Sequence, residues 1–352
     1  MESMISGKRV LITGGTGSLG KALVKRMLGS PKDRPAKIIV FSRDEAKQHF
    51  MRVEYQQEKN VSENIVYKDF EQTLEFRIGD VRDYDTVCSA LRNVDIVINA
   101  AALKQVPVCE YFPHEAIRTN IIGAENIVRA IEEHKFPIET VVGVSTDKAC
   151  KPVNVMGMTK SIQERIIISG NLCCPATRFI CVRYGNVLAS RGSVIPLFRS
   201  QIKNGGPVTI TTREMTRFLL GLGRAVDTIF TAVRDAARGE TFIPKIPAAR
   251  IVDVATALIG DRDIEIKDVG IRPGEKIHEI LVSEEEGWRT YLKGNYYVIQ
   301  PILPELRVRP ENIAQEYLNK EYCSADCVCT LEEVRELLKR HGLIDRKTSC
   351  VT

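Results

Sequence analysis

Short apolar runs alternate with helical patterns along the first half of the chain. Apolar runs rich in β-branched residues occupy positions 8–13, 37–41, 74–78, 94–98, 139–144 and 179–183. Between them, apolar residues recur at the three-to-four spacing of an amphipathic helix at positions 21–28, 44–58 and 113–133. Strands and helices in alternation predict an α/β fold, a doubly wound parallel sheet with helices on both of its faces.

The alternation ends near residue 190. Beyond it come shorter segments interrupted by proline and glycine, such as Gly205-Gly206-Pro207. The pattern predicts a doubly wound domain over residues 1–190, a smaller lobe over 191–290 that covers its open edge or interleaves with it, and a C-terminal extension over 291–352. A cleft is expected between the domain and the lobe.

The last amphipathic pattern follows Thr330. Thr330 and Glu333 have the spacing of a capping box, in which each side chain accepts from the backbone N–H of the other residue. The spacing predicts a helix that begins after Thr330. We expect its apolar side to pack on the body of the protein or on a neighbouring subunit.

Composition excludes several classes of protein. The 352 residues are 44% hydrophobic and 27% charged, which is typical of a folded globular chain rather than a disordered or coiled-coil one. Lys and Arg number 50 against 45 Asp and Glu, and because the two signs are interspersed no nucleic-acid partner is expected. No apolar run approaches the ~20 residues of a membrane span, and the N-terminus does not resemble a signal peptide. We therefore expect a cytoplasmic protein without membrane insertion.

The ten cysteines are scattered along the chain, which favours reduced thiols over a disulfide framework. One cluster, Cys323, Cys327 and Cys329, lacks the second nearby pair that a zinc site needs, and His341 does not supply it. Plain thiols are the favoured interpretation, and no metal is predicted.

A glycine-rich segment joins the first predicted strand to the first predicted helix. Gly14, Gly17 and Gly20 permit, in turn, a tight turn, a close approach of pyrophosphate to the backbone, and close packing of helix on strand. The N-terminus of the helix then faces an anion. Because the turn lies between a strand and a helix, it predicts a Rossmann-type domain that binds a dinucleotide.

The end of the second strand favours NADP over NAD. NAD-binding proteins usually place an acidic residue there for the ribose hydroxyl, whereas NADP needs a cation for the 2′-phosphate. Ser42 and Arg43 end this strand, and Lys47 lies one helical turn further on, so both cations can converge on a phosphate. Asp44 is the competing signal, because its carboxylate suits a ribose hydroxyl.

Two more strand ends are expected to contact the cofactor. Asp80 and Val81 follow the third strand, where Asp80 is expected to accept a hydrogen bond from the adenine amino group. Ala100, Ala101 and Ala102 follow the fourth strand, and their small side chains allow a cofactor to pass close to the backbone.

Taken together, four segments resemble a known family. They are the glycine turn from Thr13 to Gly20, residues 100–107, Ser145-Thr146-Asp147-Lys148-Ala149 and Arg183-Tyr184-Gly185-Asn186-Val187. They resemble the extended short-chain dehydrogenase/reductase superfamily and, within it, the 4,6-dehydratases that act on UDP-N-acetylglucosamine in bacterial polysaccharide and glycan synthesis. The likeness runs from about Arg9 to Lys276 and is most specific at 101–107 and 145–149.

The resemblance implies a lyase with an acid and a base at the end of the fifth strand. Such an enzyme oxidises C4 of the sugar, removes the C5 proton, expels the C6 hydroxyl as water and returns the hydride to C6. Asp147 is expected to act as the acid toward the C6 oxygen. Lys148 is expected to act as the base at C5, for which its pKa must be lowered.

The helix that follows departs from the common pattern of the superfamily. Lys160 is expected to hold the nicotinamide ribose, but the catalytic tyrosine four residues earlier is replaced by Met156, whose thioether cannot act as a base. Thr146, Asp147 or an ordered water relayed to Lys160 are the candidates for removing the C4 hydroxyl proton. The departure fits the dehydratases of this subgroup better than tyrosine-dependent epimerases.

The resemblance also implies contacts along both ligands. The further cofactor contacts are Thr16, Ser18, Leu19, Asn120 and Val187. The expected sugar-nucleotide contacts are Lys104, Asn186, Arg191, Gly192, Ser193, Val194, Val208, Arg217, Arg272 and Glu275.

These features predict a homo-oligomeric, NADP-dependent dehydratase whose UDP-sugar substrate is UDP-N-acetylglucosamine. A dehydratase for GDP-N-acetylglucosamine and a nucleotide-sugar 4-epimerase are the enzyme alternatives. An NADP-sensing regulatory protein is the alternative that is not an enzyme. Retention or inversion at C5 depends on the placement of Lys148 and is left open by the sequence.

Overall fold

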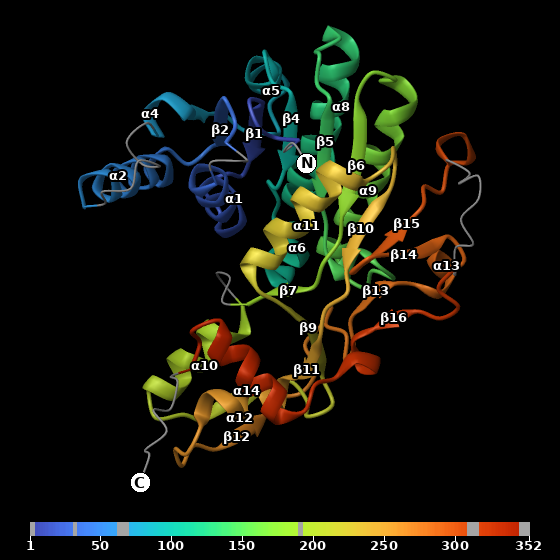
Figure 1. The fold of residues 1–352 in the computed structure, drawn as a ribbon. Helices are drawn as coiled ribbons and strands as arrows, with labels where there is room; N and C mark the ends of the chain where they lie inside the picture. Colours follow the sequence, from blue (N-terminus) through green and yellow to red (C-terminus); the bar gives the residue numbers. More distant parts are fainter. Residues whose placement is uncertain (1–3, 31–33, 62–69, 189–192, 308–316, 345–352) are drawn as a thin grey trace.

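A nine-stranded sheet forms the larger body of the molecule, in the order β14-β15-β10-β6-β5-β4-β1-β2-β3 (Figure 1). The computed structural model describes residues 4–30, 34–61, 70–188, 193–307 and 317–344. In this order, the strands β10, β6, β5, β4, β1, β2 and β3 run parallel to one another. At the other edge, β15 and β14 are antiparallel. The nine strands are β1 (Arg9–Thr13), β2 (Lys37–Ser42), β3 (Leu74–Ile78), β4 (Ile96–Asn99), β5 (Thr140–Val144), β6 (Arg178–Val182), β10 (Thr241–Pro244), β14 (Thr290–Lys293) and β15 (Tyr296–Ile299). The predicted doubly wound α/β fold is confirmed.

The central strands are largely apolar because helices cover both faces of the sheet. In β1, Val10 and Ile12 belong to one hydrophobic core and Leu11 to the other, since successive side chains point to opposite faces. The covering helices are α1 (Ser18–Gly29) and α11 (Leu222–Asp235) on one face, and α5 (Tyr84–Leu91), α8 (Gly123–His134) and α9 (Val155–Cys173) on the other. The remaining helix of this half that the sequence predicted is α2 (Glu45–Val61).

The single helix predicted over 113–133 is divided into three parts. A short helix α7 (Pro113–Ala116) leads into a π-helical segment η2 (Ile117–Ile122), and α8 follows it. Within η2, the Asn120 amide accepts from the Leu103 N–H at 2.8 Å and donates to the Leu103 carbonyl at 3.0 Å. π turns are frequent at functional sites, and this one ties the helix to the loop that follows β4 (Ile96–Asn99).

A second lobe lies below the sheet in Figure 1 and has its own hydrophobic core. It consists of β7 (Asn186–Val187), α10 (Val194–Lys203), β8 (Val208–Ile210), β9 (Thr216–Leu220), β11 (Ala248–Arg250), α12 (Ile251–Ile259), β12 (Ile266–Asp268) and α14 (Leu331–Arg340). The capping box predicted at Thr330 and Glu333 is present and starts α14. Val334 and Leu338 of this helix are buried in the core of the second lobe. The C-terminal helix therefore packs on the body of its own chain.

Strands from beyond residue 190 return to the large sheet. β10 pairs with β6, and β15 pairs with β10, so that one sheet draws on both halves of the chain. The domain limits at residues 190 and 290 stay a prediction. Within the described ranges, no helix combines the length and the apolar character that a membrane crossing requires.

Candidate active site

A cavity of about 1180 Å³ opens at the carboxyl ends of the parallel strands. In open α/β sheets this edge, at the point where the strand order reverses, is where ligands bind. The loops after β1 to β6 form one wall, and residues of the second lobe, among them Leu197, Phe198 and Ile251, form another. The cavity is larger than the ~300–1,000 Å³ of a typical single-ligand pocket, so it has room for a dinucleotide and a second ligand.

The glycine turn after β1 lines the cavity with Gly14, Thr16, Gly17, Ser18, Leu19 and Gly20. Gly14 has a φ of +64°, and a side chain there would meet the Ala101 backbone at 2.9 Å. A Cβ on Gly20 would lie 2.3 Å from the Gly15 carbonyl oxygen, which is why helix and turn can pack only with glycine. No side chain caps the N-terminus of α1, whose N-cap is Gly17. These free N–H groups and the space in front of them fit a pyrophosphate.

The loops after β2 and β3 meet at one end of the cavity. Ser42, Arg43 and Lys47 line it together with Asp80. The Arg43 side chain is 58% exposed, and its Nη1 lies 3.8 Å from Asp80 Oδ2, so its guanidinium is available to an anion. Lys47 instead donates to Asp44.

Arg82 also belongs to this end, although it does not line the cavity. Its guanidinium donates two bonds to Asp80 Oδ2, at 2.9 and 2.7 Å, and one to Glu115. Burial alone would raise the pKa of Asp80, but the hydrogen bonds and the charge of Arg82 lower it by more. The net pKa is lowered, so the carboxyl stays ionised. Asp80 therefore keeps only part of its accepting capacity for an adenine. Nothing in the spacing of the sequence marks Arg82 as its partner.

The segment after β5 brings the predicted acid and base together. Thr146 is the N-cap of a single 3₁₀ turn, η3 (Asp147–Ala149), which follows the strand directly. Lys148 Nζ lies 3.0 Å from Asp147 Oδ1, and the Thr146 hydroxyl donates to the same oxygen at 2.9 Å. Thr146 and Lys148 line the cavity, whereas the Asp147 carboxyl is fully buried behind them. Asp147 therefore contacts two cavity-lining groups, the Thr146 hydroxyl and the Lys148 amine, without lining the cavity itself.

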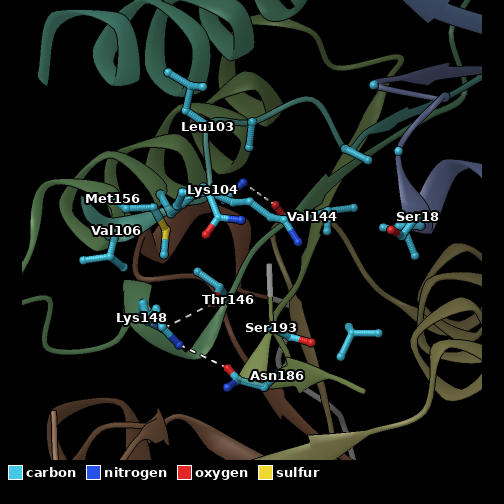
Figure 2. A pocket seen from close by; sticks show the side chains of 18 of the residues that line it. Ser18, Leu103, Lys104, Val106, Val144, Thr146, Lys148, Met156, Asn186 and Ser193 are labelled. Carbon is cyan, nitrogen blue, oxygen red and sulfur yellow. Dashed lines mark hydrogen bonds between the residues drawn. The ribbon is translucent and has the colours of Figure 1, made fainter. Parts of the chain in front are cut away.

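Three acceptors surround the Lys148 amine. Besides Asp147, they are Asn186 Oδ1 at 3.2 Å and Glu279 Oε1 at 3.0 Å. Figure 2 shows Lys148 and Asn186 turned toward each other, with Thr146 and Ser193 around the same space. Burial lowers the pKa of Lys148, but the charges of Asp147 and Glu279 raise it more, so the net shift is upward. The raised pKa is opposite to the lowered pKa that was predicted for Lys148 as a base.

The two carboxyls beside Lys148 have opposite pKa shifts. Burial raises the pKa of Asp147 in spite of the neighbouring Lys148. Burial alone would also raise the pKa of Glu279, but Lys148 and Arg217 lower it more. Asp147 therefore takes up a proton more readily than an exposed carboxyl does, as an acid requires, and Glu279 favours its charged form.

Lys160 and Met156 lie on one face of α9, beside the cavity. Lys160 Nζ donates to the Val144 carbonyl at 2.5 Å and to Gln163 Oε1 at 2.6 Å. Burial lowers the pKa of Lys160 to about 8. Met156 packs in a small apolar cluster with Cys109 and Ala116 and supplies no titratable group.

Most of the other predicted contacts also line the cavity. They are Val81, Ala100, Ala101, Ala102, Lys104, Asn186, Val187, Ser193, Val194, Arg217, Arg272 and Glu275. Partial burial lowers the pKa of Lys104. Arg272 is exposed, at the rim.

Four predicted contacts do not line the cavity or cannot be located. Asn120 is buried and holds Leu103, as described above, rather than facing a ligand. Val208 is fully buried in the core of the second lobe. Arg191 and Gly192 lie outside the described residues.

Arg217 serves the protein backbone more than an open site. Its Nη1 donates to the Thr216 and Ile277 carbonyls at 2.7 and 3.0 Å, and its Nη2 donates to the Lys276 carbonyl at 2.9 Å. Its Nε lies 3.6 Å from Glu279 Oε1. The residue thus fastens the segment that carries Glu279, and few of its guanidinium N–H donors are left for a diphosphate.

Among the cavity residues that the sequence did not predict are two polar ones, Glu279 and Thr119. Glu279 follows the Arg272-Pro-Gly-Glu-Lys276 segment and is only 2% exposed. Thr119 faces the cavity from the π-helical segment, and its buried hydroxyl has no hydrogen-bond partner among the residues described. A polar residue inside a helical pattern was the only signal for Thr119, and nothing in the local pattern distinguishes Glu279.

The described part of the chain contains no group of three or more His, Cys, Asp or Glu side chains placed to hold a metal ion. Cys323, Cys327 and Cys329 are free thiols. Burial raises the pKa of all three.

Residues 10–301 match a protein family described as polysaccharide biosynthesis protein. The chain is 42% identical to a UDP-glucose 4-epimerase of Rickettsia akari (strain Hartford), over 95% of this chain and 96% of that protein. It is also 42% identical to an inverting UDP-N-acetylglucosamine 4,6-dehydratase of Campylobacter jejuni, over 85% of this chain and 84% of that protein. Among solved structures, Pen from Bacillus thuringiensis matches with a TM-score of 0.84 at 35% identity, over 96% of this chain and 99% of that chain.

Proposed function

The chain belongs to the family of polysaccharide biosynthesis proteins, and from this premise we propose that it is an NADP-dependent UDP-N-acetylglucosamine 4,6-dehydratase. At the coarser level that its relatives share, it is a nucleotide-sugar-modifying enzyme of the short-chain dehydrogenase/reductase type. The substrate, the reaction and the preference for NADP are the proposal.

The observation that carries the proposal is the Asp147/Lys148 pair beside the cavity. A hydride-transfer enzyme that only oxidises and reduces one carbon needs no second acid and base next to the sugar. Here a carboxyl with a raised pKa and an amine lie 3.0 Å apart at the end of a central strand. Water elimination across C5 and C6 uses such a pair, because one proton must leave carbon while another is supplied to the departing hydroxyl.

The cofactor supplies acceptance of hydride from C4 and its return to C6. The glycine turn, the uncapped start of α1 and Lys160 would hold it. Lys160 keeps its amine inside the wall of the cavity through Val144 and Gln163, where it would reach a ribose hydroxyl.

The proton transfers are assigned to residues of this chain. Lys148 accepts the C5 proton while Asp147 supplies a proton to the C6 hydroxyl, and the Thr146 hydroxyl carries that proton because it contacts both Asp147 and the cavity. The C4 hydroxyl gives up its own proton during oxidation. This proton replaces the one that Asp147 has supplied to the departing water. Atoms balance when the C5 proton returns from Lys148 to the sugar.

The experiment is an incubation without oxygen, with UDP-N-acetylglucosamine, the purified protein and no added reductant. The product should be lighter than the substrate by the mass of one water, and no NADPH should accumulate. Net NADPH formation without loss of water would refute the proposal. A parallel incubation with GDP-N-acetylglucosamine tests the choice of nucleotide.

A UDP-sugar 4-epimerase is the second candidate, because a relative with that name matches 95% of this chain at 42% identity. An epimerase returns the hydride to C4, so its product has the same mass as the substrate. Detection of an isomer in place of the lighter product would favour it.

Arg43 is expected to decide between NADP and NAD. The Arg43→Ser substitution should weaken NADPH binding about tenfold, because a charge-assisted hydrogen bond to the 2′-phosphate is lost. Binding of NADH, which has no 2′-phosphate, should be nearly unchanged. Fluorescence titration with each reduced cofactor measures both constants. Lys25→Ser, at an exposed lysine of α1, is the control and should alter neither constant. Equal weakening of both cofactors would contradict a role at the 2′-phosphate.

A further inference from the structure

A buried cluster of charges surrounds the amine of Lys148. Asp147, Glu279 and Arg217 are each less than 10% exposed, and they bring two negative charges and one positive charge to the Lys148 cation. An ammonium group has three N–H donors. Asp147, Asn186 and Glu279 accept one each, at 3.0, 3.2 and 3.0 Å. The hydrogen bonds are therefore those of a fully protonated lysine.

Glu279 is held in this position from both sides. Its backbone N–H donates to Ser324 Oγ at 2.9 Å, and its carbonyl accepts from the Ser324 N–H at 2.8 Å. Arg217 fastens the preceding segment through the carbonyls of Lys276 and Ile277. The Glu279 carboxylate thus meets Lys148 from an anchored backbone and lines the cavity beside it.

Both carboxyls keep one oxygen without a partner. Asp147 Oδ2 and Glu279 Oε2 are buried and accept no hydrogen bond from the residues that the structure describes. A buried carboxylate oxygen with no donor is unfavourable. One of the two carboxyls, Asp147 or Glu279, can therefore take up a proton.

We propose that Glu279 is a positioning residue that holds Lys148 as an ammonium in the substrate-free site, so that Lys148 becomes an amine only by passing a proton to Asp147. This inference rests on the proposed dehydration. In the transfer, the Nζ–H bond breaks and an O–H bond forms on Asp147 Oδ1, along the 3.0 Å hydrogen bond. The pair keeps the same number of protons throughout, and the transfer creates the acid and the base of the elimination together.

The electrostatic effect of Glu279 depends on its distances to the other charges. Its carboxylate contacts the Lys148 amine directly, so it favours the tautomer in which the proton lies on nitrogen. The other charged groups that act on Glu279 and Lys148 are Asp147, Arg217 and Lys276. Loss of the Glu279 charge should therefore lower the pKa of Lys148 while the remaining neighbours stay in place.

The test measures Lys148 itself, by competitive acetylation of amines across a range of pH with peptide mass spectrometry. In the wild type, the midpoint for Lys148 should lie above that of exposed lysines. In Glu279→Gln, whose amide oxygen still accepts from Nζ, the midpoint should fall by about one to two pH units. Glu275→Gln is the matched control: it removes another carboxylate of the same cavity, and it should leave the midpoint unchanged.

An unchanged midpoint in Glu279→Gln would overturn the inference. Glu279→Asp keeps the charge but withdraws it by one methylene, so its midpoint should lie between those of the wild type and Glu279→Gln. This gentler variant carries the test if the glutamine variant does not fold, and a wild-type midpoint in it would then count against the inference.

The alkaline limb of the pH profile of kcat provides a second measurement. It should move to lower pH in Glu279→Gln, by about the same one to two units. A role confined to packing would lower kcat and leave the limb in place. Because acetylation needs no substrate, its result is independent of the reaction. A wild type that forms no dehydrated product would refute the proposed function alone.

Discussion

Replacing Lys148 by arginine is expected to lower the rate of water loss from UDP-N-acetylglucosamine by about a thousandfold. A positioned acid or base contributes roughly 10²–10⁴-fold to a rate, and a guanidinium cannot release a proton at neutral pH. Arginine keeps the positive charge between Asp147 and Glu279, so the buried carboxylates stay paired. The rate is measured as formation of the product that has lost water.

The control for this substitution is Lys151→Arg. Lys151 belongs to the same loop, is exposed, and pairs with Glu321 at 2.9 Å. Its replacement should leave kcat within about twofold of the wild type, as expected for a surface ion pair. Binding of NADPH should be unaffected in Lys148→Arg, which separates loss of chemistry from loss of the site. A Lys148→Arg variant that retains most of its activity would eliminate Lys148 as the base.

The largest effect on stability is expected at Arg183. Its guanidinium contacts Glu164 at 2.6 Å and Glu286 at 2.8 Å, and it donates to the Leu281 carbonyl at 2.8 Å. Arg183 and Glu164 are no more than 5% exposed. Arg183→Met removes the cation and leaves two carboxylates buried together. Breaking a buried ion pair in this way typically costs about 3–5 kcal/mol.

Urea unfolding of Arg183→Met at neutral pH measures this loss. Arg129→Met removes an exposed helical pair with Glu133, and because exposed ion pairs contribute little to stability its unfolding midpoint should stay close to that of the wild type. Equal unfolding midpoints for the two variants would show that the buried network contributes nothing to stability.

The pH dependence of stability provides an independent measure of the same network. Burial would raise the pKa of Glu286, but Arg183 outweighs it and holds the pKa at about 2. A carboxyl with a lowered pKa stabilises the folded state above its ordinary pKa of 4.5, and this contribution is lost as the pH falls toward 2. The wild-type melting temperature should therefore drop across this window, and Arg183→Met should show a smaller drop.

The sheet and the glycine turn could be predicted from sequence because each depends on local pattern. β1 reads as a continuous apolar run since both of its faces are covered, and Gly14 and Gly20 are required by contacts within the turn and its neighbouring loop. The division of the helix at Ile117–Ile122 could not be predicted, because it accompanies a bond between Asn120 and Leu103.

The electrostatics of the site depend on residues that are distant in sequence. The pair of Asp147 and Lys148 could be located because the two residues are adjacent and follow a strand. The direction of the Lys148 pKa shift could not be predicted, because it depends on Glu279, which only the folded chain brings within 3.0 Å. Arg82 lies only two residues from Asp80, but the bonds between their side chains depend on the turn that follows β3 and could not be predicted either.

The position of α14 has a consequence for biosynthesis. Val334 and Leu338 complete the core that supports α10 and α12, and these helices contribute Phe198 and Ile251 to the wall of the cavity. This helix leaves the ribosome after all of the residues assigned to the chemistry. A nascent chain that already carries the acid, the base and the cofactor turn therefore still lacks the support for one wall, and a premature stop codon before Leu331 should abolish function without removing a single reacting group.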